Sequence, residues 1–178
     1  NVFAQENKSF VRLGLSTGLS DSPSYSFAIE YGKIFRHLEG GLKFSYYNTF
    51  PLSNENRSVG FIDRGNGQNV FFTDAKYYSG KKYLSLTLNI GYNILSLFSD
   101  KHNFTPFVAF GCGSLTKLDN TFADNTVSLD YDYKIAFEYG FGARYEYALN
   151  DKVRLGAYYK YYNFLERNIL GVNISRIF

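Results

Sequence analysis

Residues 83–94 read Tyr-Leu-Ser-Leu-Thr-Leu-Asn-Ile-Gly-Tyr-Asn-Ile, which alternates apolar and small polar residues without a break. Successive side chains of a β-strand point to opposite faces, so this period of two predicts a strand. Leu84, Leu86, Leu88 and Ile90 share one face. An ordinary strand has about 5–6 residues, whereas a tilted strand that crosses a bilayer has roughly 9–11. The stretch therefore has the length of a membrane-crossing strand, and the question is which face meets which solvent.

The same alternation recurs along the rest of the chain, and no segment has a helical period. The other strands are expected at residues 10–19, 25–36, 41–50, 104–115, 134–147, 152–164 and 168–178. Eight such strands without helices predict an all-β fold, an eight-stranded antiparallel up-and-down barrel.

The connections between these strands differ in length. Most are short, but residues 48–81 form a long polar segment, expected to be an extracellular hairpin loop, and residues about 117–128 are expected to be a second polar loop. Short turns on one side and long loops on the other are typical of transmembrane barrels. A ten-stranded barrel, in which residues 58–62 and 69–78 also cross, is the alternative, although the first of these is too short.

Composition limits the class of protein further. The chain has 178 residues, which predicts one domain spanning 1–178. Its 17 Tyr and 18 Phe coexist with a mean hydropathy of −0.25, as expected when apolar residues occupy every second position. The scattered basic residues and net charge of +3 argue against nucleic acid. The single Cys112 excludes an internal disulfide and a Cys-based metal cluster, and no cofactor is expected.

The start of the chain resembles a processing site. Val2-Phe3-Ala4-Gln5 is similar to the small-residue end of a secretory signal peptide. Residues 1–8 are therefore expected to be a flexible segment or a signal remnant.

The polar face of the strands decides between two barrels that are inside-out versions of each other. In a soluble, lipocalin-like barrel the polar face would meet water and carry dense charge. Here that face is rich in Gly and Ser with isolated charges, which favours a narrow interior and places the apolar face in lipid. Aromatic residues near strand ends predict interfacial girdles: Tyr25, Phe35, Tyr46, Tyr47, Tyr77, Tyr78, Tyr145 and Tyr147.

The chain resembles the small eight-stranded outer-membrane barrels of Gram-negative bacteria, the OmpA/OmpX type. Besides strand number and loop asymmetry, the resemblance rests on the final segment, whose alternating Leu170, Val172, Ile174 and Phe178 match a membrane-insertion signal. Arg176 departs from the pattern. The resemblance implies an outer-membrane location with periplasmic termini. It also implies contacts with outer-membrane lipid and lipopolysaccharide, with the barrel insertion machinery and with other envelope proteins.

Isolated charges on the polar face are expected to meet inside the barrel. They are Arg12, Glu30, Lys43, Lys134, Glu138, Arg144, Glu146, Arg154 and Lys160. A three-residue turn at 149–151 would place Glu146 opposite Arg154. An eight-stranded barrel has an interior that side chains fill, so these residues predict a salt-bridged plug; the alternative is a path for protons or small ions.

Catalysis finds little support in the sequence. Lipid-modifying barrels use a His near the outer leaflet, whereas His37 and His102 fall in turns expected on the periplasmic side. Without a His base, Ser and Asp lack the usual activation. The sequence therefore favours a protein that is not an enzyme, with a lipid-modifying enzyme kept as an alternative.

The long loop is the best candidate for function. Phe61, Phe71, Phe72, Tyr77 and Tyr78 would project beyond the membrane and invite a partner by strand addition or hydrophobic docking, or they pack on one another. The expected function is that of a non-enzymatic envelope structural or interaction protein, or a subunit of an outer-membrane complex. A narrow channel is the alternative.

Overall fold

A computed structural model describes the backbone of residues 8–19, 24–49, 56–57, 60–63, 69–72, 75–76, 80–123, 126–163 and 167–178. Side chains are described for residues 8–19, 24–48, 82–116, 132–163 and 168–178.

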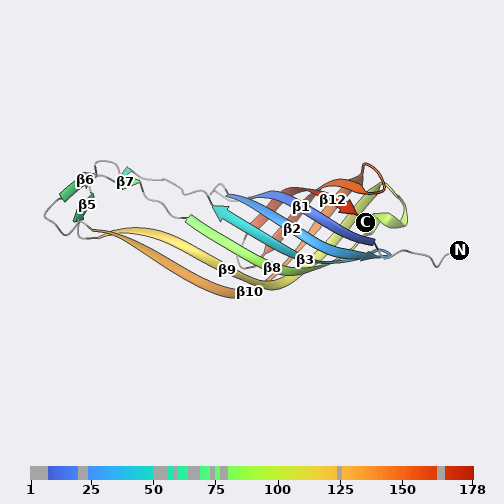
Figure 1. Cartoon of the computed structure of the whole chain (residues 1–178), viewed down its shortest axis with the longest axis horizontal. Coiled ribbons are helices and arrows are strands. Elements are labelled where there is room, and N and C mark those ends of the chain that lie inside the picture. The colour runs from blue at the N-terminus through green and yellow to red at the C-terminus, as the bar shows by residue number, and fades with distance from the viewer. Residues whose placement is uncertain are drawn as a thin grey trace.

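Eight antiparallel strands form a closed barrel (Figure 1). Around the barrel each strand pairs with its neighbours in the order β1-β12-β11-β10-β9-β8-β3-β2, and β1 closes onto both β12 and β2. The eight-stranded barrel expected from the sequence is confirmed. The strands are β1 (Lys8–Gly18), β2 (Ser24–Phe35), β3 (Leu38–Thr49), β8 (Gly80–Tyr92), β9 (His102–Ala123), β10 (Thr126–Ala148), β11 (Val153–Tyr162) and β12 (Arg167–Ile177).

The insertion between β3 and β8 does not add strands to the barrel, so the ten-stranded alternative is wrong. β4 (Asn56–Arg57) pairs with β7 (Ala75–Lys76), and β5 (Gly60–Asp63) pairs with β6 (Asn69–Phe72), as two separate two-stranded sheets. With at most four residues each, these strands are far shorter than the roughly 9–11 residues of a spanning strand.

The expected loop at residues 117–128 is also wrong, because β9 and β10 continue through most of it. Their ladder runs without interruption from His102↔Tyr147 to Ala123↔Thr126, and it forms a two-stranded ribbon that projects far beyond the barrel (Figure 1). A ribbon outside a membrane needs no apolar face, so polar residues there do not signal the end of a strand. The sequence analysis took polarity for loop structure.

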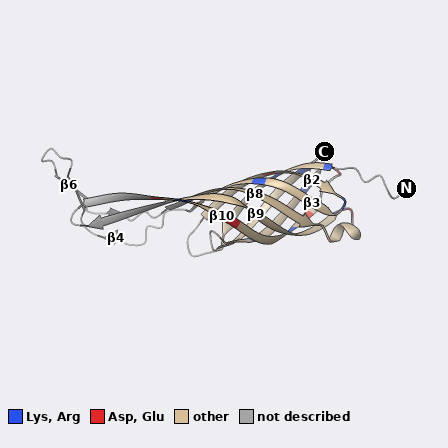
Figure 2. Cartoon of the chain, turned by 90° about the horizontal axis from the view of Figure 1, so that it is seen from below, with Lys and Arg blue, Asp and Glu red and all other residues tan. Residues whose placement is uncertain are grey.

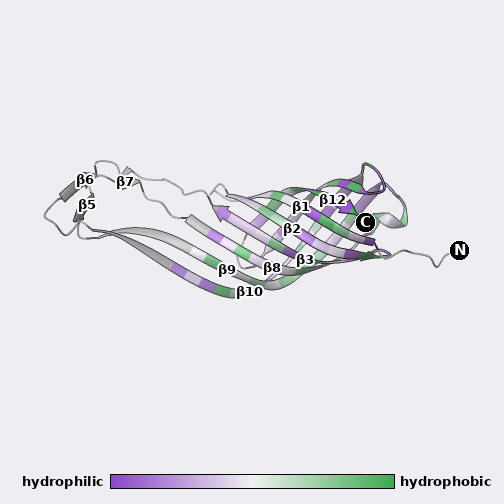
Figure 3. Ribbon diagram, viewed as in Figure 1, coloured by the Kyte–Doolittle hydropathy of each residue, from purple (hydrophilic) through white to green (hydrophobic). Residues whose placement is uncertain are grey.

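The apolar face of the strands is the outer face. Leu84, Leu86, Leu88 and Ile90 are exposed, whereas the alternate positions Ser85, Thr87 and Asn89 are buried, and Figure 3 shows the same alternation on the strands around the barrel. A lipocalin-like barrel would show the reverse, so that alternative is wrong. A continuous outer band of Leu, Ile, Phe and Tyr requires an apolar solvent, which makes this a transmembrane barrel.

Two details of the sequence analysis need correction. Glu146 pairs with Gly156, and Arg154 pairs with Ala148, so Glu146 does not lie opposite Arg154. The turn is longer than three residues, because Asn150 Oδ1 accepts the backbone N–H groups of Lys152 and Val153, both at 2.9 Å. Tyr47 is not a girdle residue, since it points inward and is 2% exposed.

The two ends of the barrel differ. At one end, here called the terminus end, lie the start of β1, the end of β12 and three turns: Arg36–His37, the segment around the short helix η1 (Leu95–Leu97), and residues 149–152. Arg36 has a φ of 58°, which suits a two-residue hairpin turn. The opposite end, called the loop end, carries the β9–β10 ribbon (Figure 1). Strand β1 begins at Lys8, the last residue of the expected flexible segment. Within the described parts of the chain, no helix is long and apolar enough to span a membrane.

A charge placed on the outer band tests the assignment of the two faces. Leu88 is exposed halfway along β8, so Leu88→Arg should lower the free energy of unfolding by about 2–4 kcal/mol in a lipid bilayer. Ile94, also exposed but at the terminus end, provides the control, because Ile94→Arg should cost about 0–1 kcal/mol near the interface. Denaturant unfolding in lipid vesicles measures both values, and equal costs at the two positions would contradict a lipid-facing band.

Candidate functional site: the barrel interior and the β9–β10 ribbon

The interior of the barrel is layered along its axis. Toward the loop end, the buried side chains Tyr47, Tyr83, Tyr162 and Ile169 form an apolar cluster with Ala109. Toward the terminus end, Phe10 and Ile177 are buried. Buried charged side chains contact both groups: the guanidinium carbon of Arg12 lies 4.4 Å from the centroid of the Phe10 ring, and Glu138 accepts a hydrogen bond from Tyr83. Charged and aromatic side chains therefore fill the interior together.

Glycines make room for the interior rings. A Cβ atom on Gly113 would lie 2.0 Å from the hydroxyl oxygen of Tyr83, and one on Gly140 would lie 2.4 Å from Cδ1 of Tyr162. On the other side of the barrel, a Cβ on Gly171 would lie 2.5 Å from Cζ of Tyr158. The glycine-rich polar face therefore has a steric cause, as the sequence analysis expected.

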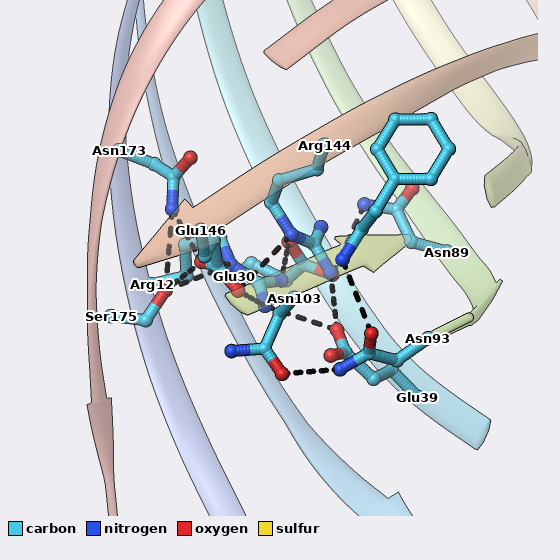
Figure 4. Close-up of polar contacts among 11 residues, drawn as sticks. Arg12, Glu30, Glu39, Asn89, Asn93, Asn103, Arg144, Glu146, Asn173 and Ser175 are labelled. Atoms are coloured by element: carbon cyan, nitrogen blue, oxygen red, sulfur yellow. Dashed lines mark hydrogen bonds and ion pairs between the residues drawn. The ribbon is translucent and has the colours of Figure 1, made fainter. Parts of the chain in front are cut away.

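Arg12 of β1 is the centre of the main polar network (Figure 4). Its Nη1 donates to Glu30 Oε2 at 2.9 Å, its Nη2 to Glu39 Oε2 at 3.1 Å, and its Nε to Glu146 Oε1 at 3.1 Å. One guanidinium thus joins strands β2, β3 and β10, and it crosses the barrel to do so.

A second arginine and several neutral groups complete this network. Arg144 pairs with Glu39, and its Nε lies 3.5 Å from Glu146 Oε2. Glu146 Oε1 also accepts hydrogen bonds from Asn173 Nδ2 at 2.6 Å and Ser175 Oγ at 2.5 Å. Buried charges are tolerated when they are paired and hydrogen-bonded, and Glu146 meets both conditions.

A smaller cluster lies nearer the loop end. Tyr83 donates its hydroxyl hydrogen to Glu138 Oε2. Lys160 Nζ donates to the Tyr162 hydroxyl at 3.2 Å and lies 4.2 Å from the centroid of that ring. Lys43 Nζ lies 5.1 Å from the centroid of the Tyr158 ring. Aromatic rings therefore supply much of the environment of the two lysines through cation–π contacts.

The buried charges of the described residues balance, and they leave little empty space. There are four cations, Arg12, Lys43, Arg144 and Lys160, and four anions, Glu30, Glu39, Glu138 and Glu146. The cavity among them has a volume of about 10 Å³, roughly the room for one water molecule.

Not all of the expected lumen residues lie inside the barrel. Arg12, Glu30, Lys43, Glu138, Arg144, Glu146 and Lys160 are buried inside the barrel. Arg154 is half-buried at the terminus end. Lys134 is exposed, because it lies on the ribbon beyond the last β10–β11 pair, Gly140↔Tyr162.

The sequence analysis missed Glu39, which bonds both arginines of the network. The third strand was expected to begin at Gly41. Extending this strand by two residues toward the N-terminus, with the same alternation, would have put Glu39 on the inner face with Gly41.

The two histidines lie at the terminus end. His37 Nδ1 is 2.6 Å from Ser96 Oγ, and Ser96 Oγ also donates to the Asn93 carbonyl at 2.8 Å. A serine that donates its hydrogen to a carbonyl leaves the imidazole as the donor, which is the wrong arrangement for a general base. His102 Nδ1 is 2.6 Å from the Tyr145 hydroxyl.

The β9–β10 ribbon exposes a second candidate surface. On β10 the outward apolar positions continue past Tyr139, although β11 ends beside Gly140. Tyr133, Ile135 and Phe137 are 62%, 67% and 65% exposed. Among the described residues, the last contact with the β11 side is Asn163, which bonds the backbone of Tyr139. Beyond it, β10 has an edge that pairs with no barrel strand in the part of the chain that the structure describes.

The partner residues expected from the sequence lie in the insertion between β3 and β8, not on the ribbon. Phe61 pairs with Phe71 in the β5–β6 hairpin, and Figure 1 shows this hairpin near the tip of the ribbon. The side chains of Phe61, Phe71 and Phe72, and all of Tyr77 and Tyr78, lie outside the described residues.

The residues of the expected insertion signal lie on the outer face of β12 and at Phe178, which follows it. Leu170, Val172, Ile174 and Phe178 are all exposed, and the guanidinium carbon of Arg176 lies 5.3 Å from the centroid of the Phe178 ring. Among the described residues, no group of three or more His, Cys, Asp and Glu side chains is arranged to bind a metal ion.

No family model matches this sequence, and no curated protein matches it. Solved structures do match. Ail of Yersinia pestis, crystallised with the heparin analogue sucrose octasulfate, is 14% identical with a TM-score of 0.54, covering 97% of this chain and 99% of Ail. Neisserial surface protein A is 13% identical with a TM-score of 0.53, covering 96% of each chain.

A major outer-membrane protein of Thermus thermophilus is 12% identical with a TM-score of 0.57, covering 96% of this chain and 99% of that one. At these identities the likeness establishes the fold alone. This chain has the fold of the small eight-stranded outer-membrane β-barrels.

Proposed function

We propose that the protein is an integral outer-membrane barrel with a closed interior that acts as an interaction protein through its loop end. The observation that carries the proposal is the β9–β10 ribbon, where β10 holds exposed apolar side chains and, within the described residues, pairs with no barrel strand but β9 beyond Gly140. Unpaired edges bind partner strands, and exposed aromatic residues dock apolar surfaces.

The interior supports a structural plug more than a channel. Four buried cations accompany four buried anions, buried aromatic side chains pack against them, and the cavity among them has a volume of about 10 Å³. A path for ions would need continuous water, whereas this cavity has room for about one water molecule. The network then serves to fix the positions of β1, β2, β3 and β10 relative to one another.

Catalysis has no support from the two histidines. His37 and His102 lie at the terminus end, and their described partners are Ser96, Tyr145 and neighbouring rings. We therefore propose a non-enzymatic function. The proposed surroundings are outer-membrane lipid and lipopolysaccharide, with the termini in the periplasm and delivery by the barrel insertion machinery through Leu170, Val172, Ile174 and Phe178.

Removal of the central arginine tests the plug. Arg12→Met would leave three carboxylates, Glu30, Glu39 and Glu146, with Arg144 as the one arginine of this network. Breaking a buried ion pair from one side costs about 3–5 kcal/mol, and we expect a loss of that size. Lys134→Met on the exposed ribbon is the matched control and should change stability by less than about 0.5 kcal/mol. Denaturant unfolding in vesicles measures both; equal effects would remove the structural role of the network.

Planar bilayers distinguish the plug from the channel. The purified wild-type chain should give no stepwise current, because buried side chains fill the interior and leave a cavity of about 10 Å³ among the charged residues. A porin measured in the same bilayers shows that the assay detects conduction. Reproducible single-channel steps from the wild type would overturn the closed interior.

Substitutions on the two faces of the ribbon test the interaction surface. Ile135 and Lys134 are adjacent, exposed and on opposite faces. If the apolar face binds a partner, Ile135→Glu should abolish co-purification of that partner from native membranes in mild detergent, since a buried carboxylate is costly. Lys134→Glu should leave the complex intact. Recovery of the wild type as a lone monomer would contradict the proposal.

A further inference from the structure

Among the residues whose side chains the structure describes, the net positive charge is concentrated at the terminus end. The buried interior charges cancel. At the terminus end the described charged residues outside the interior are seven basic residues and the acidic Asp100 and Asp151, and Figure 2 shows Lys and Arg in blue at this end, near the C label. We call these seven the basic collar: Lys8, Lys33, Arg36, Lys101, Lys152, Arg154 and Arg176.

The collar is a product of topology. Its members come from β1, β2, β11, β12 and three different turns, and all are exposed except the half-buried Arg154. No two of them are adjacent in sequence, so the chain shows no basic run. The barrel brings them to one level because alternate turns and both ends of the barrel meet there.

Exposed apolar side chains are interleaved with the collar. The guanidinium carbon of Arg36 lies 5.9 Å from the centroid of the Phe35 ring. The guanidinium carbon of Arg176 lies 5.3 Å from the centroid of the Phe178 ring. Beside Lys101, Phe98 is 83% exposed. Cations next to exposed rings suit a boundary that offers hydrocarbon on one side and phosphate on the other.

We propose that the basic collar binds the phosphate groups of anionic phospholipids in the leaflet that surrounds the terminus end. Lipid headgroups encircle a barrel, as the collar does, whereas a soluble acidic partner would need a patch on one side and would not require the exposed rings. Arginine binds phosphate through two parallel hydrogen bonds. A basic residue near an anionic membrane surface strengthens binding by about fivefold per charge, and such attraction weakens as salt rises.

Spin-labelled lipids in reconstituted vesicles test the collar. The full chain is placed in phosphatidylcholine vesicles with a trace of spin-labelled phosphatidylglycerol or spin-labelled phosphatidylcholine, and electron paramagnetic resonance gives the fraction of each lipid held at the protein. The wild type should prefer phosphatidylglycerol, and the preference should shrink at high salt. Arg36→Gln combined with Arg176→Gln should lower it by roughly fivefold or more.

The matched control removes two charges from the opposite end. Lys82→Gln combined with Lys134→Gln should leave the lipid preference unchanged, since both residues are exposed outside the collar. Should the first pair impair folding, as circular dichroism would show, Lys33→Gln with Lys101→Gln replaces it. A wild type without preference for phosphatidylglycerol, or an equal loss in collar and control variants, would overturn the proposal. Binding of soluble poly-glutamate to the detergent-solubilised protein, without any lipid preference, would assign the collar to an acidic protein partner instead.

Discussion

Closure of β1 onto β12 is the constraint on which the other features depend. Inside a hydrocarbon layer each backbone N–H and C=O must find a hydrogen-bond partner within the protein. A closed ring of strands has no edge, so the backbone groups of β1 and β12 are paired like those of the other barrel strands. Closing a ring of eight strands also fixes the width of the interior, which then has room for side chains and little else. The composition of the inner face follows from that width.

Within this narrow interior, a large residue on one strand needs a small residue on the adjacent strand. The rings of Tyr83, Tyr158 and Tyr162 occupy space that Gly113, Gly171 and Gly140 leave open. Charged residues face a second requirement, because each must be neutralised where it lies. Arg12 satisfies three carboxylates at once, which a lysine could not do with the same planar geometry. Such a filled interior is the basis of the closed barrel proposed above.

The ends of the barrel are not subject to the close packing and charge pairing of the interior. The two ends differ in the side chains that they expose. At the loop end β9 and β10 leave the barrel as a ribbon, on which Tyr133, Ile135 and Phe137 are exposed and the β10 edge pairs with no further barrel strand among the described residues. At the terminus end the chain gathers basic groups and exposed rings around short turns. The first surface suits a partner outside the membrane, and the second suits the membrane boundary itself.

The amino-acid sequence determined the number of barrel strands and the facing of most side chains within the barrel, because a period of two is local and a shift by one residue would expose every polar position to lipid. The alternation at residues 83–94 thus put Leu84, Leu86 and Leu88 outside before any contact was known. The sequence did not determine which residues pair. Glu146 pairs with Gly156 because Asn150 stabilises a longer turn. Glu39 forms ion pairs with Arg12 and Arg144 inside the barrel. The sequence also did not predict the ribbon or the basic collar. Polar strands in water lack a periodic hydrophobic pattern, and isolated basic residues form a collar only once the barrel has closed. Those features depend on contacts between distant segments, which only the tertiary structure decides.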